Sequence, residues 1–286
     1  MRYSKVKIRF RAFIKKFIQA ALSGLVLSFG KSKLGRFIFR TILESAMQET
    51  EVMHRDGLTF RFSVANPLLG LRARTLFTKE PETLEWIDRM QQGAVLWDVG
   101  ANVGTYTVYA AVARKAKVVA FEPSVFNLEF LARNININNI VDRVTLFPIP
   151  LSNCTKINEM RLSSCEWGGA LSTFGETYDG NGDPIFQSFG YRMPGLKMDD
   201  AKRLFSLTKP DFIKIDVDGI EALILAGGGG ILAGARSVLI EINDDFESQS
   251  ENCELILKRQ GFTLKEKRRS DFESRDNDNR FITLIR

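Results

Sequence analysis

Two acidic residues and a glycine-containing turn lie close together in the sequence around residue 100. A predicted buried strand leads into Asp98-Val-Gly-Ala-Asn-Val-Gly104, and an apolar helix follows from about Thr105. Glycine at such a turn permits a positive φ or a close approach of backbone to a ligand, and the start of the helix leaves N–H groups unsatisfied. Glu122 follows Asp98 by 24 positions, at the end of the next predicted strand, where a carboxylate can accept hydrogen bonds from ribose hydroxyls. The spacing indicates a site for a nucleoside cofactor.

The residues of the turn distinguish two classes of nucleoside cofactor. Dinucleotide binding is typical of G-x-G-x-x-G, whose glycines let a pyrophosphate lie on the helix N-terminus. Here the turn reads Gly-Ala-Asn-Val-Gly, and an acid, Asp98, lies on the incoming strand. A carboxylate there repels a pyrophosphate but suits the cationic amino group of S-adenosylmethionine (SAM). The alternative is a tight turn that binds no ligand.

Predicted strands alternate with predicted helices on both sides of this turn. Hydrophobic periodicity predicts helices near residues 80–90, 105–114, 125–138, 220–232 and 251–260. It predicts strands before the turn and at residues 58–64, 117–121, 144–152, 212–218, 237–243, 262–267 and 281–285. Since such an alternation is typical of parallel sheets covered on both faces, we expect an α/β fold. The last two strands should add a terminal antiparallel hairpin at the edge of the sheet.

Residues 163–196 are the least regular part of this region and are rich in glycine and aromatic residues. Long connections of this kind in compact domains are often lids or binding loops. We therefore expect a substrate lid, with a solvent-exposed hairpin pinned by its aromatic side chains as an equal alternative.

Length and composition fit one enzyme-sized domain with an appendage. The chain has 286 residues, of which 44% are hydrophobic and 26% are charged, and such a chain can bury a full α/β core. The three cysteines have no C-x-x-C spacing, so they indicate neither a disulfide framework nor a zinc site. A reducing compartment is the simpler interpretation, and we expect a cytoplasmic protein.

Basic residues are concentrated at the N-terminus. Residues 1–43 contain eleven Lys and Arg and no acid, whereas the formal net charge of the whole chain is +6, so the remainder is net acidic. Apolar residues follow helical spacing at Phe10, Phe13, Ile14, Phe17, Ile18, Ala21, Leu22 and Leu25. The uncharged run at residues 17–30 is shorter than the about 20 residues that a membrane span needs.

Three interpretations of this segment stay open: a helix on a membrane surface, a helix docked on the protein's own body or on a partner, and a cleaved targeting segment. We expect residues 1–45 to form a basic amphipathic helical segment, with peripheral membrane contact through residues 1–43 as the first interpretation. Residues 46–286 should form the α/β domain.

The motifs together resemble those of FkbM-type class I SAM-dependent methyltransferases. The resemblance covers about residues 75–245, and its most discriminating part is the run Lys214-Ile-Asp-Val-Asp-Gly-Ile-Glu221. The other matching motifs are Glu80-Pro-Glu82, Asp98 to Gly104, Phe121-Glu-Pro123, Leu151-Ser152, Gly168-Gly-Ala-Leu-Ser172, Met198-Asp-Asp200 and Leu239-Ile-Glu-Ile242. Asp218 stands where many members of the family carry Glu. The resemblance implies a Rossmann-like fold with a mostly parallel seven-stranded sheet, which binds SAM and methylates a hydroxyl oxygen of a glycan, a polyketide-like compound or another small metabolite.

Under this resemblance, each cofactor-binding residue has an expected role. Asp98 orients the turn or the methionine amino group, and the turn lets backbone approach the cofactor. Glu122 holds the ribose, Phe121 and Pro123 flank the adenine, and Ser152 lies near the adenine edge or merely caps a strand end. The full expected set is Asp98, Gly100, Ala101, Asn102, Gly104, Phe121, Glu122, Pro123 and Ser152.

The expected catalytic residues are carboxylates, because the sole histidine, His54, lies far in sequence from the cofactor motif. A hydroxyl acceptor needs a base, and Asp216 is our first candidate and Glu241 our second, since both lie at or near strand ends. The neighbouring Asp218 could instead cap the helix that starts at Ile220. The sequence assigns no metal ligands, although a divalent metal could bind if Asp216 and Glu241 converge.

Two other functions compete with catalysis on a small acceptor. One is a membrane-tethered scaffold that binds SAM without catalysis. The other is a nucleic-acid methyltransferase, which the pI of about 9.2 would suit. Because the chain beyond residue 43 is net acidic, it lacks the excess of Lys and Arg that phosphate binding needs, and we disfavour nucleic acid. The sequence does not indicate the oligomeric state.

Overall fold

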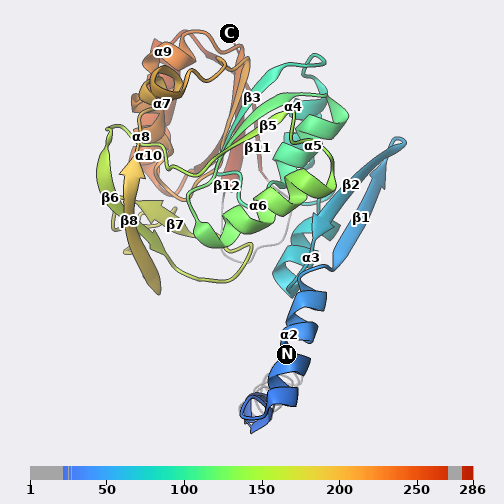
Figure 1. Ribbon diagram of the computed structural model, residues 1–286. Helices are drawn as coiled ribbons and strands as arrows, with labels where there is room; N and C mark the ends of the chain where they lie inside the picture. Colours follow the sequence, from blue (N-terminus) through green and yellow to red (C-terminus); the bar gives the residue numbers. More distant parts are fainter. Residues whose placement is uncertain (1–21, 25, 27, 270–278, 286) are drawn as a thin grey trace, which may run out of the picture. The chain divides into compact units, whose positions relative to one another are not determined.

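The structure is a computed structural model that describes residues 22–24, 26, 28–269 and 279–285 (Figure 1). The chain divides into two compact units, Met1–Glu49 and Thr50–Arg286. The predicted apolar stripe from Phe10 to Leu25 lies outside the described residues, apart from Leu22. None of the described helices is long and apolar enough to cross a membrane.

The main feature of the first unit is helix α2, Lys33–Ala46. The hydroxyl of Ser32 accepts a hydrogen bond from Gly35 N and so caps the helix N-terminus. Leu34, Phe37, Ile42 and Leu43 are large apolar side chains that are each more than half exposed. The described part of this helix therefore presents an apolar surface to solvent.

A mostly parallel sheet forms the centre of the second unit. Its parallel strands are β3 (Val95–Val99), β4 (Lys117–Phe121), β5 (Val144–Phe147), β9 (Phe212–Ile215) and β10 (Ser237–Asn243). The antiparallel pair β11 (Thr263–Arg269) and β12 (Asn279–Ile285) extends one edge, and the order is β11-β12-β10-β9-β3-β4-β5. The prediction of a mostly parallel α/β sheet with a terminal antiparallel hairpin is confirmed.

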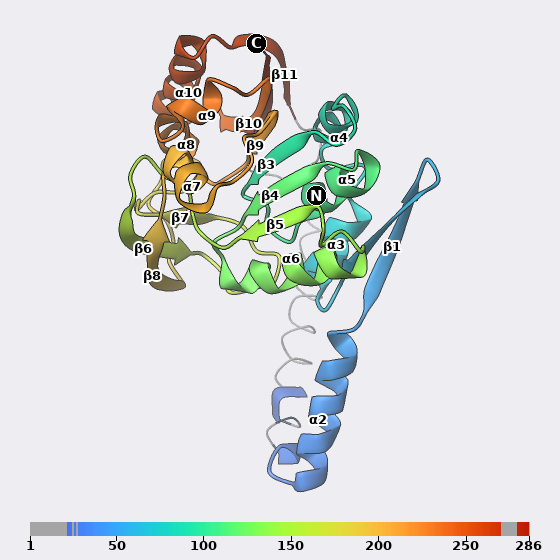
Figure 2. The same ribbon diagram turned by 45° about the horizontal axis from the view of Figure 1, so that its top comes forward.

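Helices cover both faces of this sheet (Figures 1 and 2). One face packs against α4 (Pro81–Asp88), α5 (Thr105–Ala113) and α6 (Val125–Ile137), and the other against α7 (Met198–Phe205), α8 (Glu221–Ala226), α9 (Gly229–Leu232) and α10 (Glu247–Arg259). Successive side chains of β3 serve the two cores, since Leu96 packs with the first and Trp97 with the second. Burial on both faces explains why the parallel strands are almost continuously apolar.

Two predicted strands end earlier than expected. The prediction that the third strand runs to Ser152 is wrong, because β5 ends at Phe147. Pro148 and Pro150 follow directly, and proline cannot donate to the hydrogen-bonded ladder of the sheet. The strand predicted at residues 212–218 likewise ends at Ile215, so Asp216 and Asp218 lie in the connection beyond it.

Two smaller antiparallel sheets flank the main one. Strands β1 (Thr50–Arg55) and β2 (Leu58–Ser63) form a hairpin that leads into helix α3 (Pro67–Arg74). Strands β6 (Lys156–Leu162), β7 (Ser172–Phe174) and β8 (Phe189–Gly195) form a sheet in the order β7-β6-β8. The irregular region predicted at residues 163–196 thus consists of a loop between β6 and β7, strand β7, a second loop and strand β8.

Candidate active site

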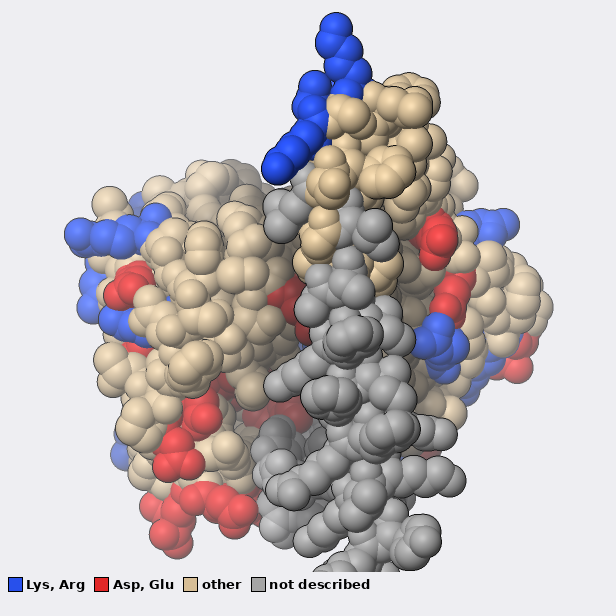
Figure 3. Space-filling model, turned by 90° about the horizontal axis from the view of Figure 1, so that it is seen from below, with Lys and Arg blue, Asp and Glu red and all other residues tan. Residues whose placement is uncertain are grey.

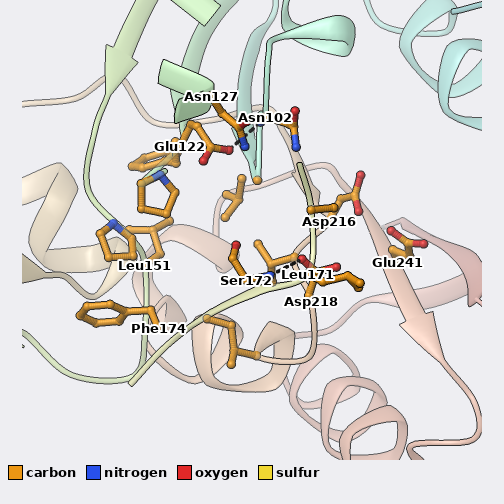
Figure 4. Close-up of a pocket in the computed structure, with 18 of the residues that line it drawn as sticks. Asn102, Glu122, Asn127, Leu151, Leu171, Ser172, Phe174, Asp216, Asp218 and Glu241 are labelled. Atoms are coloured by element: carbon orange, nitrogen blue, oxygen red, sulfur yellow. Dashed lines mark hydrogen bonds between the residues drawn. The ribbon is translucent and has the colours of Figure 1, made fainter. Parts of the chain in front are cut away.

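A cavity of about 340 Å³ lies where the parallel strands β3, β4, β9 and β10 end (Figure 4). The chain leaves β3 toward β4 on one side and reaches β9 on the other, so the strand order reverses here. Ligands of open α/β sheets bind in the crevice at such a reversal. The volume falls within the range of about 300 to 1,000 Å³ that is usual for small-molecule sites.

The turn after β3 requires glycine at its first bend. Gly100 has a φ of +83°, and a Cβ atom there would lie 1.9 Å from the carbonyl oxygen of Asp216. The N–H groups of Gly100 and Ala101 both donate to Phe121 O, which joins the turn to the end of β4. At the far end of the turn, Gly104 also has a positive φ and begins α5. Of this turn, Gly100 and Asn102 are among the residues that line the cavity.

Glu122 lies in the cavity wall directly after β4, and it is buried. Its Oε2 accepts a hydrogen bond from Asn102 N at 2.7 Å, and its Oε1 accepts one from Ser124 N at 2.8 Å. Burial raises the pKa of Glu122 to about 7, although these two hydrogen bonds oppose the shift. The side chain of Asn127 donates a third hydrogen bond to this carboxylate, which leaves one further acceptor position for a ligand.

Asp98 lies on β3 behind the turn and is not among the residues that line the cavity. Its Oδ2 accepts a hydrogen bond from the hydroxyl of Thr107, which ties the strand to α5. Burial raises the pKa of Asp98, while the charge of Lys214 opposes that rise. Of the two predicted roles for Asp98, this position is compatible with orienting the turn.

The predicted adenine-binding residues are only partly gathered at the cavity. Phe121 and Pro123 line it, and Leu151 from the connection after β5 joins them. Ser152 is not among the residues that line the cavity. Its N–H donates to the carbonyl oxygen of Leu196, the residue after β8. An apolar wall that includes Met160, Phe174, Ile220 and Ile224 completes this side.

The loop between β6 and β7 lines the cavity and is fixed by polar side chains. Asn102 and Asn127 both donate from Nδ2 to Gly169 O, at 2.8 and 3.1 Å. Asn127 Oδ1 accepts from Gly168 N at 3.0 Å, and Arg72 Nε donates to Gly168 O at 2.7 Å. The sequence predicted either a lid or an exposed hairpin here, but it gave no signal for Asn127, which is buried in α6, or for Arg72, which is partly buried in α3.

Asp218 holds the next part of the same loop. Its Oδ2 accepts a hydrogen bond from Ser172 N at 3.0 Å, so the suggestion that Asp218 caps the following helix is wrong. Burial raises the pKa of Asp218 to about 6. The neighbouring Leu171 has a φ of +60°, which is strained for a branched residue, and it lies in the cavity wall.

Two carboxyl groups and a buried lysine meet beside the turn. Asp216 and Glu241 both line the cavity, and they hydrogen-bond to each other. The ammonium of Lys214, on a side chain that is 1% exposed, forms an ion pair with Asp216 Oδ2. Figure 4 shows Asp216, Asp218 and Glu241 on one side of the cavity, apart from the group formed by Glu122, Asn102 and Asn127.

The surroundings of the two carboxyl groups shift their pKa values in opposite directions. Burial alone would raise the pKa of Asp216, but the Lys214 charge and the Glu241 hydrogen bond outweigh it and hold that pKa below its usual value. Burial and the neighbouring Asp216 charge raise the pKa of Glu241 well above its usual value. Since two adjacent carboxylates resist joint ionisation, Glu241 is the more basic carboxyl group of the pair.

Other candidates lie outside this arrangement. His54 is on β1, where its ring hydrogen-bonds to Thr59, and it does not line the cavity. Among the residues that the structure describes, no three His, Cys, Asp or Glu side chains form a group that could hold a metal ion.

Comparisons with known proteins agree with this geometry. Residues 98–264 match the family model described as the methyltransferase FkbM domain. The chain is similar to the hexuronic acid methyltransferase AglP of Haloferax volcanii, with 26% identity over 199 residues, which are 69% of this chain and 76% of that protein. It is also similar to the AMB antimetabolite synthetase AmbE of Pseudomonas aeruginosa, with 25% identity over 65% of this chain but only 10% of that protein.

A solved structure adds a more distant likeness. The methyltransferase FkbM from Methylobacillus flagellatus KT has 17% identity and a TM-score of 0.44, over 68% of this chain and 44% of that one.

Proposed function

The chain belongs to the methyltransferase FkbM family, and from this premise we propose that it methylates a hydroxyl oxygen of a sugar or a related small metabolite. SAM is the cofactor, and it supplies a methyl group made electrophilic by a sulfonium centre. One observation carries the proposal. Glu122, which can accept a hydrogen bond from a ribose, lines the same cavity as the carboxyl pair of Asp216 and Glu241.

The residues of the cavity fit this cofactor. Glu122 has an acceptor position left that suits a ribose hydroxyl. Phe121, Pro123 and Leu151 offer an apolar slot for the adenine. Gly100 lines the cavity and, as glycine, presents only backbone atoms to a cofactor.

We assign the proton transfer to the pair of Asp216 and Glu241, with Glu241 as the residue that titrates. Asp216 is the first candidate from sequence, but Lys214 makes it a weak proton acceptor by stabilising its ionised form. A general base works best when its pKa lies near the working pH, and Glu241 has the raised pKa of the two. Asp216 then holds Glu241 in position, and Glu241 accepts the acceptor's proton once it is ionised.

A sugar-like acceptor has the best support among the classes that the sequence leaves open. The relative AglP is named for a hexuronic acid, which is a sugar acid rich in hydroxyl groups. The side of the cavity near Asp216 is lined by carboxyl groups that can accept hydrogen bonds from hydroxyls, and these include Asp218 and Glu241.

A nucleic-acid acceptor has less support. On the face shown in Figure 3, basic side chains on the body are interspersed with acidic ones and form no continuous basic band among the described residues. Binding of a phosphate backbone depends on Lys and Arg gathered along a groove.

Peripheral membrane contact through the N-terminal unit is a separate part of the proposal. The described residues that support it are the exposed apolar side chains of α2, among them Leu34 and Phe37, and the basic residues Lys33, Arg36 and Arg40 on the same helix. A helix of this composition can bury its apolar face at an anionic lipid surface.

The experiment that tests the function is methyl transfer from labelled SAM to a panel of acceptors. The panel contains free sugars, hexuronic acids, glycolipid extracts, polyketide-like alcohols and RNA, and each product is identified by mass. We expect a gain of one methyl group on a sugar-containing acceptor. Methylation of RNA alone, or tight SAM binding without transfer to any acceptor, would contradict the proposal.

A further inference from the structure

A second, smaller cavity of about 40 Å³ adjoins the main one on the far side of the glycine turn. It is lined by Gly100, Ala101 and Asn102 of the turn and by the start of α5. The residues that line both cavities are Arg72, Lys79, Glu80, Gly100, Asn102 and Asp216. The two spaces therefore meet at the turn.

Charges of both signs surround this smaller cavity. Glu80 is 2% exposed, forms an ion pair with Lys79 and accepts hydrogen bonds from Thr83 and Tyr106. Arg72 approaches from α3, and its Nε is fixed by the carbonyl oxygen of Gly168. That bond involves one of the five N–H donors of the guanidinium.

The position of the cavity follows from the cofactor placement above. A ribose held by Glu122, with its adenine against Phe121 and Pro123, leaves the remaining arm of the cofactor to cross the Gly100 turn. That arm ends in an ammonium and a carboxylate. Asp98, the residue that the sequence suggested for the ammonium, lies behind the turn, so another carboxylate must fill this role.

We infer that Arg72 and Glu80 form the subsite for the amino-acid end of the cofactor, with Arg72 binding the carboxylate and Glu80, beside Asp216, accepting the ammonium. This inference rests on the proposed placement of the ribose at Glu122. A guanidinium suits a carboxylate because it offers parallel N–H donors. The motif Glu80-Pro-Glu82, which opens helix α4, thereby acquires a role in binding the cofactor.

The test compares two ligands that differ only at this end. S-adenosylhomocysteine carries the amino acid, whereas 5′-methylthioadenosine has the same nucleoside and sulfur without it. Calorimetry on the full chain should show that Arg72→Met weakens binding of S-adenosylhomocysteine by about tenfold or more, as for loss of a charge-assisted hydrogen bond. Binding of 5′-methylthioadenosine should change less than about threefold.

Arg74→Met is the matched control, because Arg74 lies on the same helix but is exposed and pairs with Glu51. It should leave both affinities unchanged. Glu80→Gln, which keeps the side-chain shape, should also weaken only the first ligand, and its melting temperature shows whether it folds.

The outcomes separate this inference from the proposed function. If Arg72→Met weakens both ligands equally, or weakens neither, the subsite is wrong while the nucleoside site stands. If the unmodified protein binds neither ligand, the placement of the cofactor fails as well.

Discussion

At the scale of single residues, Glu122 is the group whose ionisation should control cofactor binding. Its pKa is about 7 because burial disfavours the carboxylate. Ribose hydroxyls donate to the ionised form, so binding should strengthen as pH rises through 7 and weaken as Glu122 gains its proton. Between pH 8 and pH 6 we expect the affinity for S-adenosylhomocysteine to fall about tenfold, as measured by calorimetry.

Glu122→Gln is the control for this pH dependence. The amide cannot ionise, so the affinity should be low and nearly constant across the same range. A dependence on pH that persists in Glu122→Gln would mean that another group, such as Asp218 with its pKa of about 6, is responsible.

The carboxyl pair leads to a second prediction at this scale. Glu241→Gln should lower turnover by about 10² to 10⁴ and leave cofactor affinity within about threefold, because it removes the base. In the unmodified protein, kcat/KM should rise with pH as Glu241 loses its proton, and the midpoint should lie well above that of an ordinary glutamate.

Asp216→Asn distinguishes the two members of the pair. Without the Asp216 charge, Glu241 should ionise more easily, so the pH profile should shift toward lower pH while some activity remains. If Asp216→Asn abolishes turnover and Glu241→Gln does not, the assignment of the two roles is reversed.

Part of the lining of this cavity could be predicted from the sequence, for a physical reason. Glu122, Asp216 and Glu241 lie at or near the ends of strands, and the carboxyl ends of parallel strands meet at one edge of a sheet. Arg72, Asn127 and Lys214 could not be assigned in this way, because their positions depend on how α3, α6 and the sheet pack. Ser152 was predicted to lie at the end of the third strand, but that strand ends at Phe147, before Pro148 and Pro150.

At the scale of elements, the glycine turn after β3 should tolerate substitution poorly. Gly100→Ala would place a Cβ atom 1.9 Å from the carbonyl oxygen of Asp216, in addition to the strain of a positive φ. Because backbone cannot move aside as a side chain can, we expect a loss of at least about 2 kcal/mol in the free energy of unfolding. Urea denaturation measures it.

Gly57→Ala is the matched control for the turn. Gly57 has a φ of +77°, but no atom lies within 4 Å of the added Cβ. It should therefore cost only the backbone strain, about 1 kcal/mol. Equal losses in the two variants would show that the close approach to Asp216 does not matter.

The order of strands and helices could be predicted from the sequence, whereas the position of the loop between β6 and β7 could not. Hydrophobic periodicity identified the alternation of strands and helices because parallel strands buried on both faces are almost wholly apolar. It could not show that the loop between β6 and β7 lines the cavity, since Asn102 and Asn127 reach that loop from distant parts of the chain.

At the scale of the whole molecule, the N-terminal unit is the part that we expect to contact a membrane. If it binds a membrane surface, the full chain should co-sediment with anionic vesicles more than with neutral ones, and added salt should weaken the attraction. Replacing Leu34 and Phe37 together by Ser should reduce binding about a hundredfold or more, because each burial of such a side chain contributes about 1.5 to 3 kcal/mol.

Phe186→Ser serves as the control for the vesicle experiment, since Phe186 is 78% exposed but lies in the second unit of the chain. It should bind vesicles as the unmodified protein does. Vesicle binding that is unaffected by the α2 substitutions and equal on neutral lipid would contradict membrane contact through this helix.

The most direct test of the whole account is a crystal structure of the protein with S-adenosylhomocysteine. We expect a ribose hydroxyl within hydrogen-bond distance of the Glu122 carboxylate, and the sulfur facing the side of the cavity that Asp216 and Glu241 line. A ligand whose ribose lies away from Glu122, or whose sulfur points away from Glu241, would contradict the proposed site and its chemistry.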